Sequence, residues 1–255
     1  MANAGFTEFS YGYALTDNLL RTHFQGLKRA PIFPSLVAEG RSGGGYDIEI
    51  PLHPVPLFLQ FKVPIVIRRR SKLIPPDYWV PYYRFVLRTW EPNQHQLLLD
   101  LEKKFPLVFY VAPLFDKVER LDEHFVNKQV HSYSTFIQPS RIGPLDNSMH
   151  YVAFQSGASV YWRFSEPRPI EGAYKGDNFL SLLPQTKEGS HRTNASELLH
   201  SLWAWFIEIQ PARQLERREA VGYRFPEKDV REQARQVAYL AQVRLGLTLA
   251  LLDPE

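Results

Sequence analysis

An aspartate, a glutamine and a lysine in the first quarter of the chain are residue types suited to metal-dependent phosphodiester hydrolysis. Asp47 follows three consecutive glycines, and Gln60 and Lys62 come later with one residue between them. Carboxylate and amide oxygens bind hard divalent cations. A bound cation lowers the pKa of an attacking water, and a neighbouring lysine neutralises charge that develops on the phosphate. The three side chains indicate this chemistry if one surface holds them together.

Two short predicted strands supply such a surface. Residues 46–50 alternate between apolar and acidic side chains, which puts Asp47 on the polar face. Residues 57–62 end in a Q-x-K triplet, so Gln60 and Lys62 point to the same side of their strand. A proline-rich turn separates the two strands. Pairing of these strands is predicted to place an acid, an amide and a lysine on one polar face.

At these residues the chain resembles the PD-(D/E)xK superfamily of nucleases, which has the restriction-endonuclease-like fold. The likeness is to its Mrr-type variants, in which a glycine-rich turn and an aspartate precede a strand that ends in Q-x-K. The resemblance implies that Asp47 and Gln60 are ligands of Mg²⁺ or Mn²⁺ and that Lys62 is the catalytic lysine. It also implies that Glu8, on the preceding predicted helix, is a further ligand. The alternative for Glu8 is that it only complements the helix dipole.

The resemblance covers less than half of the chain and implies a magnesium-dependent endodeoxyribonuclease that restricts foreign DNA, as a defence effector acting alone or in a larger complex. The sequence departs from the motif of the superfamily at two positions. Gln60 stands where an acid is commoner, so the pocket has one negative charge fewer and depends on Glu8 or Glu49. Tyr46, in place of proline, precedes Asp47. These departures leave a second function open: a catalytically inactive protein of the same fold that binds nucleic acid or a partner protein.

Two other segments match the motif but lack its structural context. Residues 185–187 form a second Q-x-K triplet, which is predicted to lie in a loop without a suitable acid before it. Pro76-Asp77 followed by Glu102-Lys103-Lys104 matches the superfamily name literally. Residues 93–105 have helical periodicity, however, which would direct Glu102 and Lys104 to different faces.

Basic and aromatic residues follow the Q-x-K strand. The run Arg68, Arg69 and Arg70, with Lys72, is predicted to hold DNA phosphates near the site; the alternative is a solvated charge run. The nearby aromatic residues either stack on bases or pack in the core: Tyr78, Trp79, Tyr82 and Tyr83. DNA is therefore the expected partner, with magnesium or manganese as the cofactor.

The predicted fold class is α/β, an α+β layered domain in which helices flank a mixed restriction-endonuclease-like sheet. The predicted order is one or two helical segments over 6–27, strands 46–50, 57–62 and 82–89, helix 93–105, strand 107–112, helix 121–127, and strands 134–137 and 150–154, with a proline-interrupted connection over 63–81. Residues 161–183 are predicted to be loop-rich, and helices 194–209 and 226–252 to form a C-terminal pair. The predicted domains are a nuclease core, 1–160, and a loop-rich segment with a helical extension, 161–255.

Composition sets further limits on function. The chain has 255 residues, a net charge of +3 and no cysteine, which excludes disulfides, thiolate zinc sites and cysteine nucleophiles. The beginning lacks the pattern of a signal peptide, and no apolar run is long enough to cross a membrane, so a cytoplasmic protein is expected. Trp203, Trp205 and Phe206 mark the C-terminal helices as the place for a protein partner or a homo-oligomer; core packing is the alternative.

Overall fold

The structure is a computed structural model that describes residues 4–23, 54–69, 80–89, 93–155, 161–164, 167–185, 193–209, 225–226 and 229–252. The chain divides into two compact units. The first unit contains residues 1–27 and 60–182, and the second contains residues 28–59 and 183–255. Helices and two five-stranded sheets make up the described residues, which confirms the mixed α/β class. The predicted domain division at residue 160 stays a prediction.

One sheet is antiparallel at every pairing and lies within the first unit. Its strands, in spatial order, are β2 (Ile65–Ile67), β3 (Tyr82–Leu87), β6 (His150–Phe154), β7 (Tyr161–Phe164) and β8 (Arg168–Ile170). Alternation along β3 and β6 buries Phe85, Leu87, Val152 and Phe154. The rings of Phe85 and Phe154 lie 6.1 Å apart, so cross-strand aromatic pairs stabilise this sheet.

The second sheet is mixed and has the spatial order β10-β1-β4-β5-β9. These strands are β1 (Val55–Phe61), β4 (Val108–Pro113), β5 (Ser134–Ile137), β9 (Tyr174–Lys175) and β10 (Thr248–Leu252). Every residue of β1 and β4 is buried, Gln60 included, as in central strands of a sheet. β1 therefore lacks the alternation of an apolar and a polar face that was predicted for residues 57–62. β1 passes from the second unit to the first between Leu59 and Gln60.

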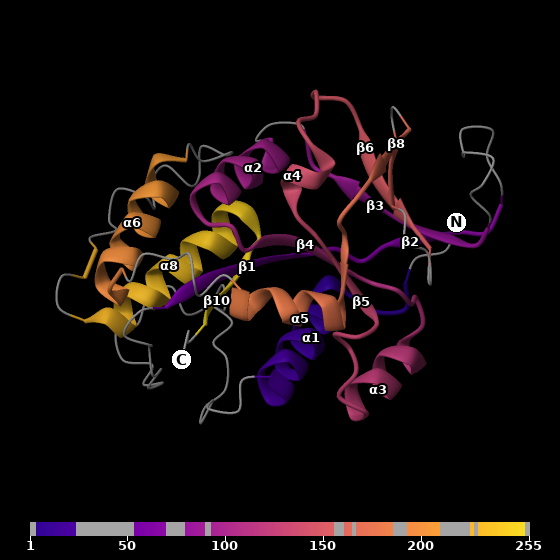
Figure 1. Cartoon of the computed structure of the whole chain (residues 1–255), viewed down its shortest axis with the longest axis horizontal. Coiled ribbons are helices and arrows are strands. Elements are labelled where there is room, and N and C mark those ends of the chain that lie inside the picture. Colours follow the sequence, from indigo (N-terminus) through magenta and orange to yellow (C-terminus); the bar gives the residue numbers. More distant parts are fainter. Residues whose placement is uncertain are drawn as a thin grey trace. The chain divides into compact units, whose positions relative to one another are not determined.

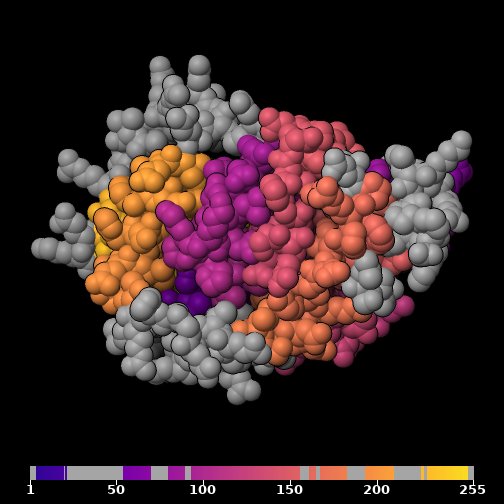
Figure 2. Space-filling view, turned by 45° about the horizontal axis from the view of Figure 1, so that its top comes forward, coloured from indigo at the N-terminus to yellow at the C-terminus, as the bar shows by residue number. Residues whose placement is uncertain are grey.

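Four described helices lie within the first unit: α1 (Glu8–His23), α2 (Gln94–Lys104), α3 (Val118–Val126) and α4 (Pro139–Ile142). α5 (Gly176–Gln185) begins in the first unit, and its last three residues belong to the second. The Asn93 side chain caps α2 by accepting a hydrogen bond from the Gln96 amide at 3.0 Å. α1 and α3 contact each other, as do α2 and α4 (Figure 1). The surfaces of α2 and α4 adjoin on the face shown in Figure 2.

The predicted C-terminal helix pair is confirmed as α6 (Ala195–Glu208) and α8 (Val230–Leu245), which lie side by side in the second unit (Figure 1). Asn194 caps α6 by accepting a hydrogen bond from the Glu197 amide. The inner faces of both helices consist of apolar side chains, including Leu199, Leu202, Phe206, Val237, Leu240 and Ala241. This apolar contact accounts for the pairing.

Several sequence predictions about secondary structure are wrong. The last helix starts after its cap Asp229 and ends before Gly246, whose φ of 65° stops it; residues 248–252 are strand β10 and not helix. Residues 161–183 are not loop-rich, because they form β7, β8, β9 and most of α5. The connection predicted over residues 63–81 contains strand β2, which pairs with β3. Among the helices of the described residues, none has the length and apolarity to cross a bilayer.

Candidate functional site

The Q-x-K triplet lies at the C-terminal end of β1. The side chain of Gln60 is buried, and its Oε1 accepts a hydrogen bond from Nε2 of Gln94 at 2.8 Å. Lys62 follows the strand directly, and its backbone amide donates to the carbonyl of Val111 on β4 at 2.8 Å. Asp47, with the strand predicted around it, lies outside the described residues. Along Val55–Leu59 the antiparallel neighbour of β1 is β10.

Helix α1 packs against the end of β1. The ring of Tyr11 meets the ring of Phe61 edge-on at 5.9 Å, and the Tyr11 hydroxyl donates to Ser134 Oγ at 2.7 Å. Gly12 allows this close approach, because a Cβ at Gly12 would lie 2.7 Å from Cδ2 of Phe61. Glu8 comes one helical turn before Gly12 on the same helix. The packing of α1 therefore brings Glu8 toward the C-terminal end of β1.

The charges of Glu8 and Lys62 interact. Burial lowers the pKa of the Lys62 ammonium below its ordinary value, and the nearby positive charge of Arg88 acts in the same direction. The negative charge of Glu8 opposes both effects by favouring the protonated amine. Two of the predicted site residues are therefore brought within electrostatic reach of each other. A partly buried lysine with a lowered pKa is the type of group that enzymes use in catalysis.

Two polar residues of this region were missed by the sequence analysis. Gln94 is the first residue of α2 and is buried against Gln60. Arg88 follows β3 and adds positive charge near Lys62. Both lie in segments that sequence periodicity identified only as secondary structure, so no motif spacing pointed to them. Their proximity to the Q-x-K triplet depends on how α2 and β3 pack.

Replacing Gly12 with alanine is expected to destabilise the protein by about 1–3 kcal/mol, because the new methyl group would clash with the Phe61 ring. Glycine-to-alanine changes inside a helix normally stabilise the protein by about 1 kcal/mol. A loss of stability in Gly12→Ala would therefore indicate the clash with Phe61. Denaturant unfolding monitored by circular dichroism measures the change. The double variant Gly12→Ala/Phe61→Leu is expected to recover part of the loss, since leucine frees space at the contact. An increase in stability in the single variant would contradict the packing of α1 on β1.

The predicted nucleic-acid-binding residues are only partly described. The Arg68 guanidinium lies 3.1 Å from Oδ2 of Asp116, an ion pair that neutralises part of its charge. Arg69 is exposed, whereas Arg70 and Lys72 lie outside the described residues. Of the neighbouring aromatic residues, Tyr82 is buried and stacks on Phe164 at 6.3 Å, and Tyr83 stacks on Phe154 at 5.7 Å. Those two tyrosines fit the core-packing alternative, and Tyr78 and Trp79 lie outside the described residues.

The structure describes Glu102, Lys103 and Gln185, which belong to the two other segments that match the motif. Glu102 lies in α2, which confirms the predicted helix, and its carboxylate accepts hydrogen bonds from the backbone amide and hydroxyl of Ser140. Lys103 pairs with Asp100 on the same helix at 2.8 Å. Gln185 is the last residue of α5 and is therefore not in a loop as predicted. The Glu102 carboxylate therefore links α2 to the first turn of α4 through Ser140.

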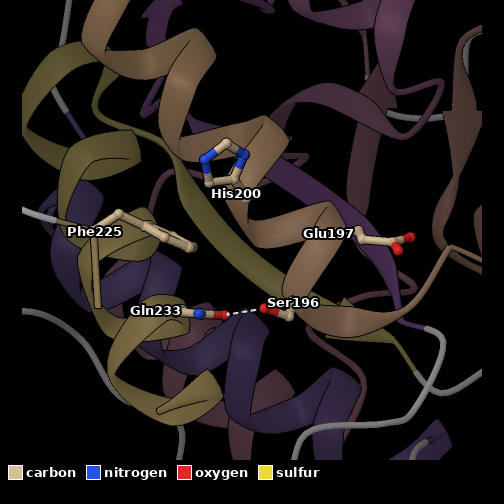
Figure 3. Close-up of a pocket in the computed structure, with 5 residues that line it drawn as sticks. All are labelled: Ser196, Glu197, His200, Phe225 and Gln233. Atoms are coloured by element: carbon tan, nitrogen blue, oxygen red, sulfur yellow. Dashed lines mark hydrogen bonds between the residues drawn. The ribbon is translucent and has the colours of Figure 1, made fainter. Parts of the chain in front are cut away.

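An open cavity of about 390 Å³ lies between α6 and α8 in the second unit (Figure 3). Ser196, Glu197, His200, Phe225 and Gln233 line it. Ser196 Oγ donates to Oε1 of Gln233 at 3.0 Å, and Gln233 Nε2 donates to the Pro226 carbonyl at 2.6 Å. These polar groups bind each other across the helix pair. Trp205 and Phe206 are buried, which fits the core-packing alternative at the C-terminal helices.

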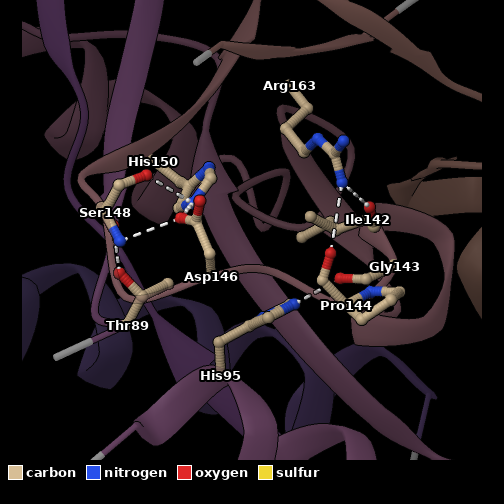
Figure 4. A network of polar contacts seen from close by, with 9 residues as sticks. All are labelled: Thr89, His95, Ile142, Gly143, Pro144, Asp146, Ser148, His150 and Arg163. Atoms are coloured by element: carbon tan, nitrogen blue, oxygen red, sulfur yellow. Dashed lines mark hydrogen bonds and ion pairs between the residues drawn. The ribbon is translucent and has the colours of Figure 1, made fainter. Parts of the chain in front are cut away.

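A polar network in the first unit surrounds His150 (Figure 4). Nε2 of His150 lies 2.7 Å from Oδ1 of Asp146 and 3.0 Å from Oγ of Ser148. Hydrogen bonds from the Ser148 side chain and amide, followed by the one to His150, lower the pKa of Asp146 to about 2. In serine hydrolases the serine and the acid bind opposite nitrogens of the histidine ring. Ser148 and Asp146 contact the same nitrogen of His150, which differs from that arrangement.

His95, which is also shown in Figure 4, uses its ring for hydrogen bonds within the core. Its Nε2 lies 2.8 Å from the carbonyl of Gly143, which can only accept, so Nε2 carries the proton. Its Nδ1 then accepts from the Tyr110 hydroxyl at 3.0 Å. Burial lowers the pKa of His95 to about 4, which keeps the ring neutral near pH 7. Both ring nitrogens are therefore used within the core.

The predicted metal site has a partial donor set in the described residues. Glu8 and Gln60 offer a carboxylate and an amide oxygen, the ligand types that suit magnesium. The described ranges contain no group of three or more histidine, aspartate or glutamate side chains arranged to hold a metal. Gln60 Oε1 also accepts the hydrogen bond from Gln94, which leaves one of its two lone-pair directions for another partner. The donor chemistry fits magnesium only together with Asp47.

Comparisons with known protein families, curated proteins and solved structures find no match for this chain. The class that can be stated is therefore the one defined by the elements themselves, a mixed α/β protein with two five-stranded sheets.

Proposed function

We propose that this chain is a metal-dependent nuclease that hydrolyses phosphodiester bonds of DNA, with Glu8, Asp47, Gln60 and Lys62 as its site. The observation that carries the proposal is the interaction between the charges of Glu8 and Lys62 at the end of β1. Glu8 is not part of the Q-x-K motif and was predicted as a ligand only from its position on the preceding helix. Its interaction with Lys62 is therefore support that does not depend on the motif match. The packing of α1 against β1 supports the order of elements that the restriction-endonuclease-like fold requires.

Each side chain has a role that follows from its chemistry. Glu8, Asp47 and the Gln60 carbonyl are oxygen ligands for Mg²⁺ or Mn²⁺, which when bound polarises the scissile phosphate and makes a water more acidic. Lys62 donates hydrogen bonds to the attacking water or to a non-bridging phosphate oxygen and neutralises negative charge there. Its lowered pKa makes proton exchange near neutral pH easier than for an exposed lysine. Gln94 holds the Gln60 amide in place from the first turn of α2.

The biological setting that suits this chemistry is the restriction of foreign DNA in the cytoplasm, as a defence effector. Arg69, together with Arg70 and Lys72, supplies positive charge that follows the Q-x-K strand in the sequence and suits phosphate contacts. The C-terminal helices remain the proposed location of a protein partner or a second copy of the chain. Sequence specificity then comes from that partner, because phosphate contacts do not read bases.

One observation favours the second candidate function, a non-catalytic protein of the same fold that binds nucleic acid or a protein. The hydrogen bond from Gln94 to Gln60 Oε1 occupies the atom that would bind the metal. A buried amide pair of this kind is stable without any metal. The two functions differ in what the Glu8 and Asp47 carboxylates do, and cleavage assays separate them.

Purified protein is expected to cleave plasmid and linear DNA with Mg²⁺ or Mn²⁺ and to lose activity in chelator. Glu8→Gln and Asp47→Asn are expected to reduce cleavage at least about 100-fold, since each removes a charge that holds the metal. Glu119→Gln is the matched control, because Glu119 is an exposed acid in the first turn of α3. Retained DNA binding with no cleavage in the unaltered protein would favour the non-catalytic function. Cleavage unaffected by both site variants would refute the proposed site.

A further inference from the structure

A second polar cluster lies farther along α1, around His131 and Ser132. The side chain of Asn18 reaches this turn from α1 and is almost fully buried, as is His131. Asn18 comes ten residues after Glu8, which is about 15 Å along the helix axis. The fourth member of the cluster is Asp177, an exposed residue in the first turn of α5. The cluster is therefore separate from the proposed metal site.

The hydrogen bonds of Asn18 determine the tautomer of His131. Oδ1 of Asn18 accepts from the backbone amide of His131 at 3.2 Å and contacts its Nδ1 at 2.7 Å. A backbone amide only donates, so the Asn18 atom at this position is the oxygen, and Nδ1 of His131 must carry a proton. In the neutral ring, Nε2 is then the basic nitrogen. The side chain of Asn18 thus orients His131 in the manner of the third member of a catalytic triad.

The basic nitrogen of His131 faces a serine. Oγ of Ser132 lies 3.2 Å from Nε2 of His131, within reach of proton transfer. Ser132 is only partly buried, so a small molecule can approach its hydroxyl. The Ser132 hydroxyl donates to Oδ1 of Asp177 at 3.1 Å, and it turns toward Nε2 of His131 when its proton is transferred. Oδ1 of Asp177 lies 3.8 Å from His131 Nε2. Its carboxylate is therefore in place to stabilise the imidazolium that forms when Nε2 takes the serine proton.

In both clusters the serine and the acid lie near Nε2 of the histidine, and the cluster at His131 also has an orienting side chain at Nδ1. At His150 the serine and the acid contact the same ring nitrogen. At His131 the orienting residue Asn18 contacts Nδ1 and the serine contacts Nε2, which is the arrangement that nucleophilic catalysis requires. Ser148 is therefore an internal control for the reactivity of Ser132.

We propose that Ser132 is a nucleophile activated by His131, with Asn18 as the positioning residue, and that it reacts with small carboxylic esters. Oγ of Ser132 adds to the ester carbonyl carbon while its proton passes to Nε2 of His131. The bond to the alcohol oxygen then breaks, and the alcohol leaves with that proton. Water attacks the resulting acyl-serine, again giving a proton to His131, and releases the carboxylic acid and the free serine. No oxidant, reductant or further reactant is needed.

The local charges restrict the substrate to uncharged or cationic esters. The Asp177 carboxylate lies beside the nucleophile and would repel a carboxylate or a phosphate group. Gly176 places the first turn of α5 directly against the backbone of His131 and Ser132. First-turn amides of a helix have no partner within the helix, so the first turn of α5 supplies donors for the oxyanion of the acyl intermediate. Anionic substrates such as DNA are disfavoured at this second site by the Asp177 charge.

An alkyl fluorophosphonate ester, an uncharged probe that phosphonylates activated serines, tests the proposal on the full-length protein in chelating buffer. Mass spectrometry of peptides from the labelled protein is expected to find the adduct on Ser132 at least about 100-fold faster than on Ser148, the gain typical of a general base. Heat-denatured protein is expected to lose this preference. Hydrolysis of 4-nitrophenyl acetate is expected to fall in Ser132→Ala and to be unchanged in Ser148→Ala.

Asn18→Asp keeps an oxygen acceptor for Nδ1 and is expected to preserve labelling of Ser132, whereas Asn18→Leu is expected to reduce it at least about tenfold. Circular dichroism identifies any variant that fails to fold, and the labelling of the unaltered protein stands without the variants. Equal labelling of Ser132 and Ser148, or no labelling of Ser132, would overturn the proposal. The assay contains no metal, so its result is independent of the nuclease test.

Discussion

Replacing Lys62 with methionine is expected to reduce metal-dependent DNA cleavage by at least about 100-fold while making the folded protein more stable. The loss follows from removal of the positive charge that faces the reacting phosphate. The gain follows from burial, because the ammonium of Lys62 is partly withdrawn from water and its pKa is lowered for that reason. Methionine has a similar length and no desolvation cost. The expected gain is about 1 kcal/mol at pH 7, or roughly 2–4 °C in Tm.

The pH dependence of this gain has a definite sign. The pKa of Lys62 is lower in the folded chain than its ordinary value of 10.5. Between the folded pKa and 10.5 the unfolded chain binds more protons, so the stability of the unaltered protein rises with pH in that range. The advantage of Lys62→Met is therefore largest below the folded pKa and shrinks as the pH approaches 10.5. Thermal unfolding from pH 7 to pH 10.5 measures this convergence.

Lys104→Met is the matched control for the lysine variant, because Lys104 is an exposed lysine in the last turn of α2. It is expected to leave both cleavage and stability nearly unchanged. An inactive Lys62→Met protein with lower stability would point to a structural lysine. A fully active one would exclude Lys62 from the site. A loss of activity combined with a gain in stability is the result that a catalytic lysine predicts, since active sites retain unfavourable burial for function.

Replacing Gly176 with alanine is expected to cost at least about 3 kcal/mol, which corresponds to a fall of roughly 6–12 °C in Tm. A Cβ at this position would lie 2.7 Å from the backbone nitrogen of Ser132 and closer still to the carbonyl of His131. These are backbone atoms, so no side-chain rotation relieves the clash. The helix α5 would have to move away from the turn at residues 131–132. Differential scanning calorimetry measures the change in Tm.

Gly5→Ala is the control for this glycine, because a Cβ there would meet its nearest neighbour, the Val118 nitrogen, at 3.4 Å. Its effect is expected to stay below about 1 kcal/mol. Equal stability of Gly176→Ala and the unaltered protein would mean that α5 does not pack on this turn. Ester hydrolysis by Ser132 would also be expected to decrease in Gly176→Ala, because the same movement displaces the helix amides from the serine.

Local patterns determined most of the secondary structure. Helix α2 was predicted because leucines recur at helical spacing between Asn93 and a proline, and both caps lie where the sequence places them. Strands β5 and β6 have the predicted bounds, 134–137 and 150–154. In each case a periodicity of 3.6 or 2 residues continues over a whole element, and the buried face follows from it directly.

The last residues of the chain could not be assigned in this way. The sequence after Gly246 is apolar and fits a helix or a strand equally well. Pairing with β1, from Val55 opposite Leu252 to Leu59 opposite Thr248, makes it strand β10. That partner lies almost two hundred residues earlier in the sequence, so only the tertiary structure decides between the two. The role of Gly12 also depends on tertiary structure. Glycine is needed at this position of α1 because the Phe61 ring packs against it, and helix propensity does not indicate this.

The sequence by itself determined that a strand ends at the Q-x-K triplet, because the apolar run stops there. β1 ends at Phe61, so Gln60 lies in the strand and Lys62 follows it. The sequence also placed Glu8 on a helix before them. Only the tertiary structure decided that Glu8 reaches the charge of Lys62, that Gln94 bonds to Gln60, and that Asn18 orients His131. Each of these contacts joins elements with no fixed spacing between them. Their geometry depends on packing, which a local pattern does not encode.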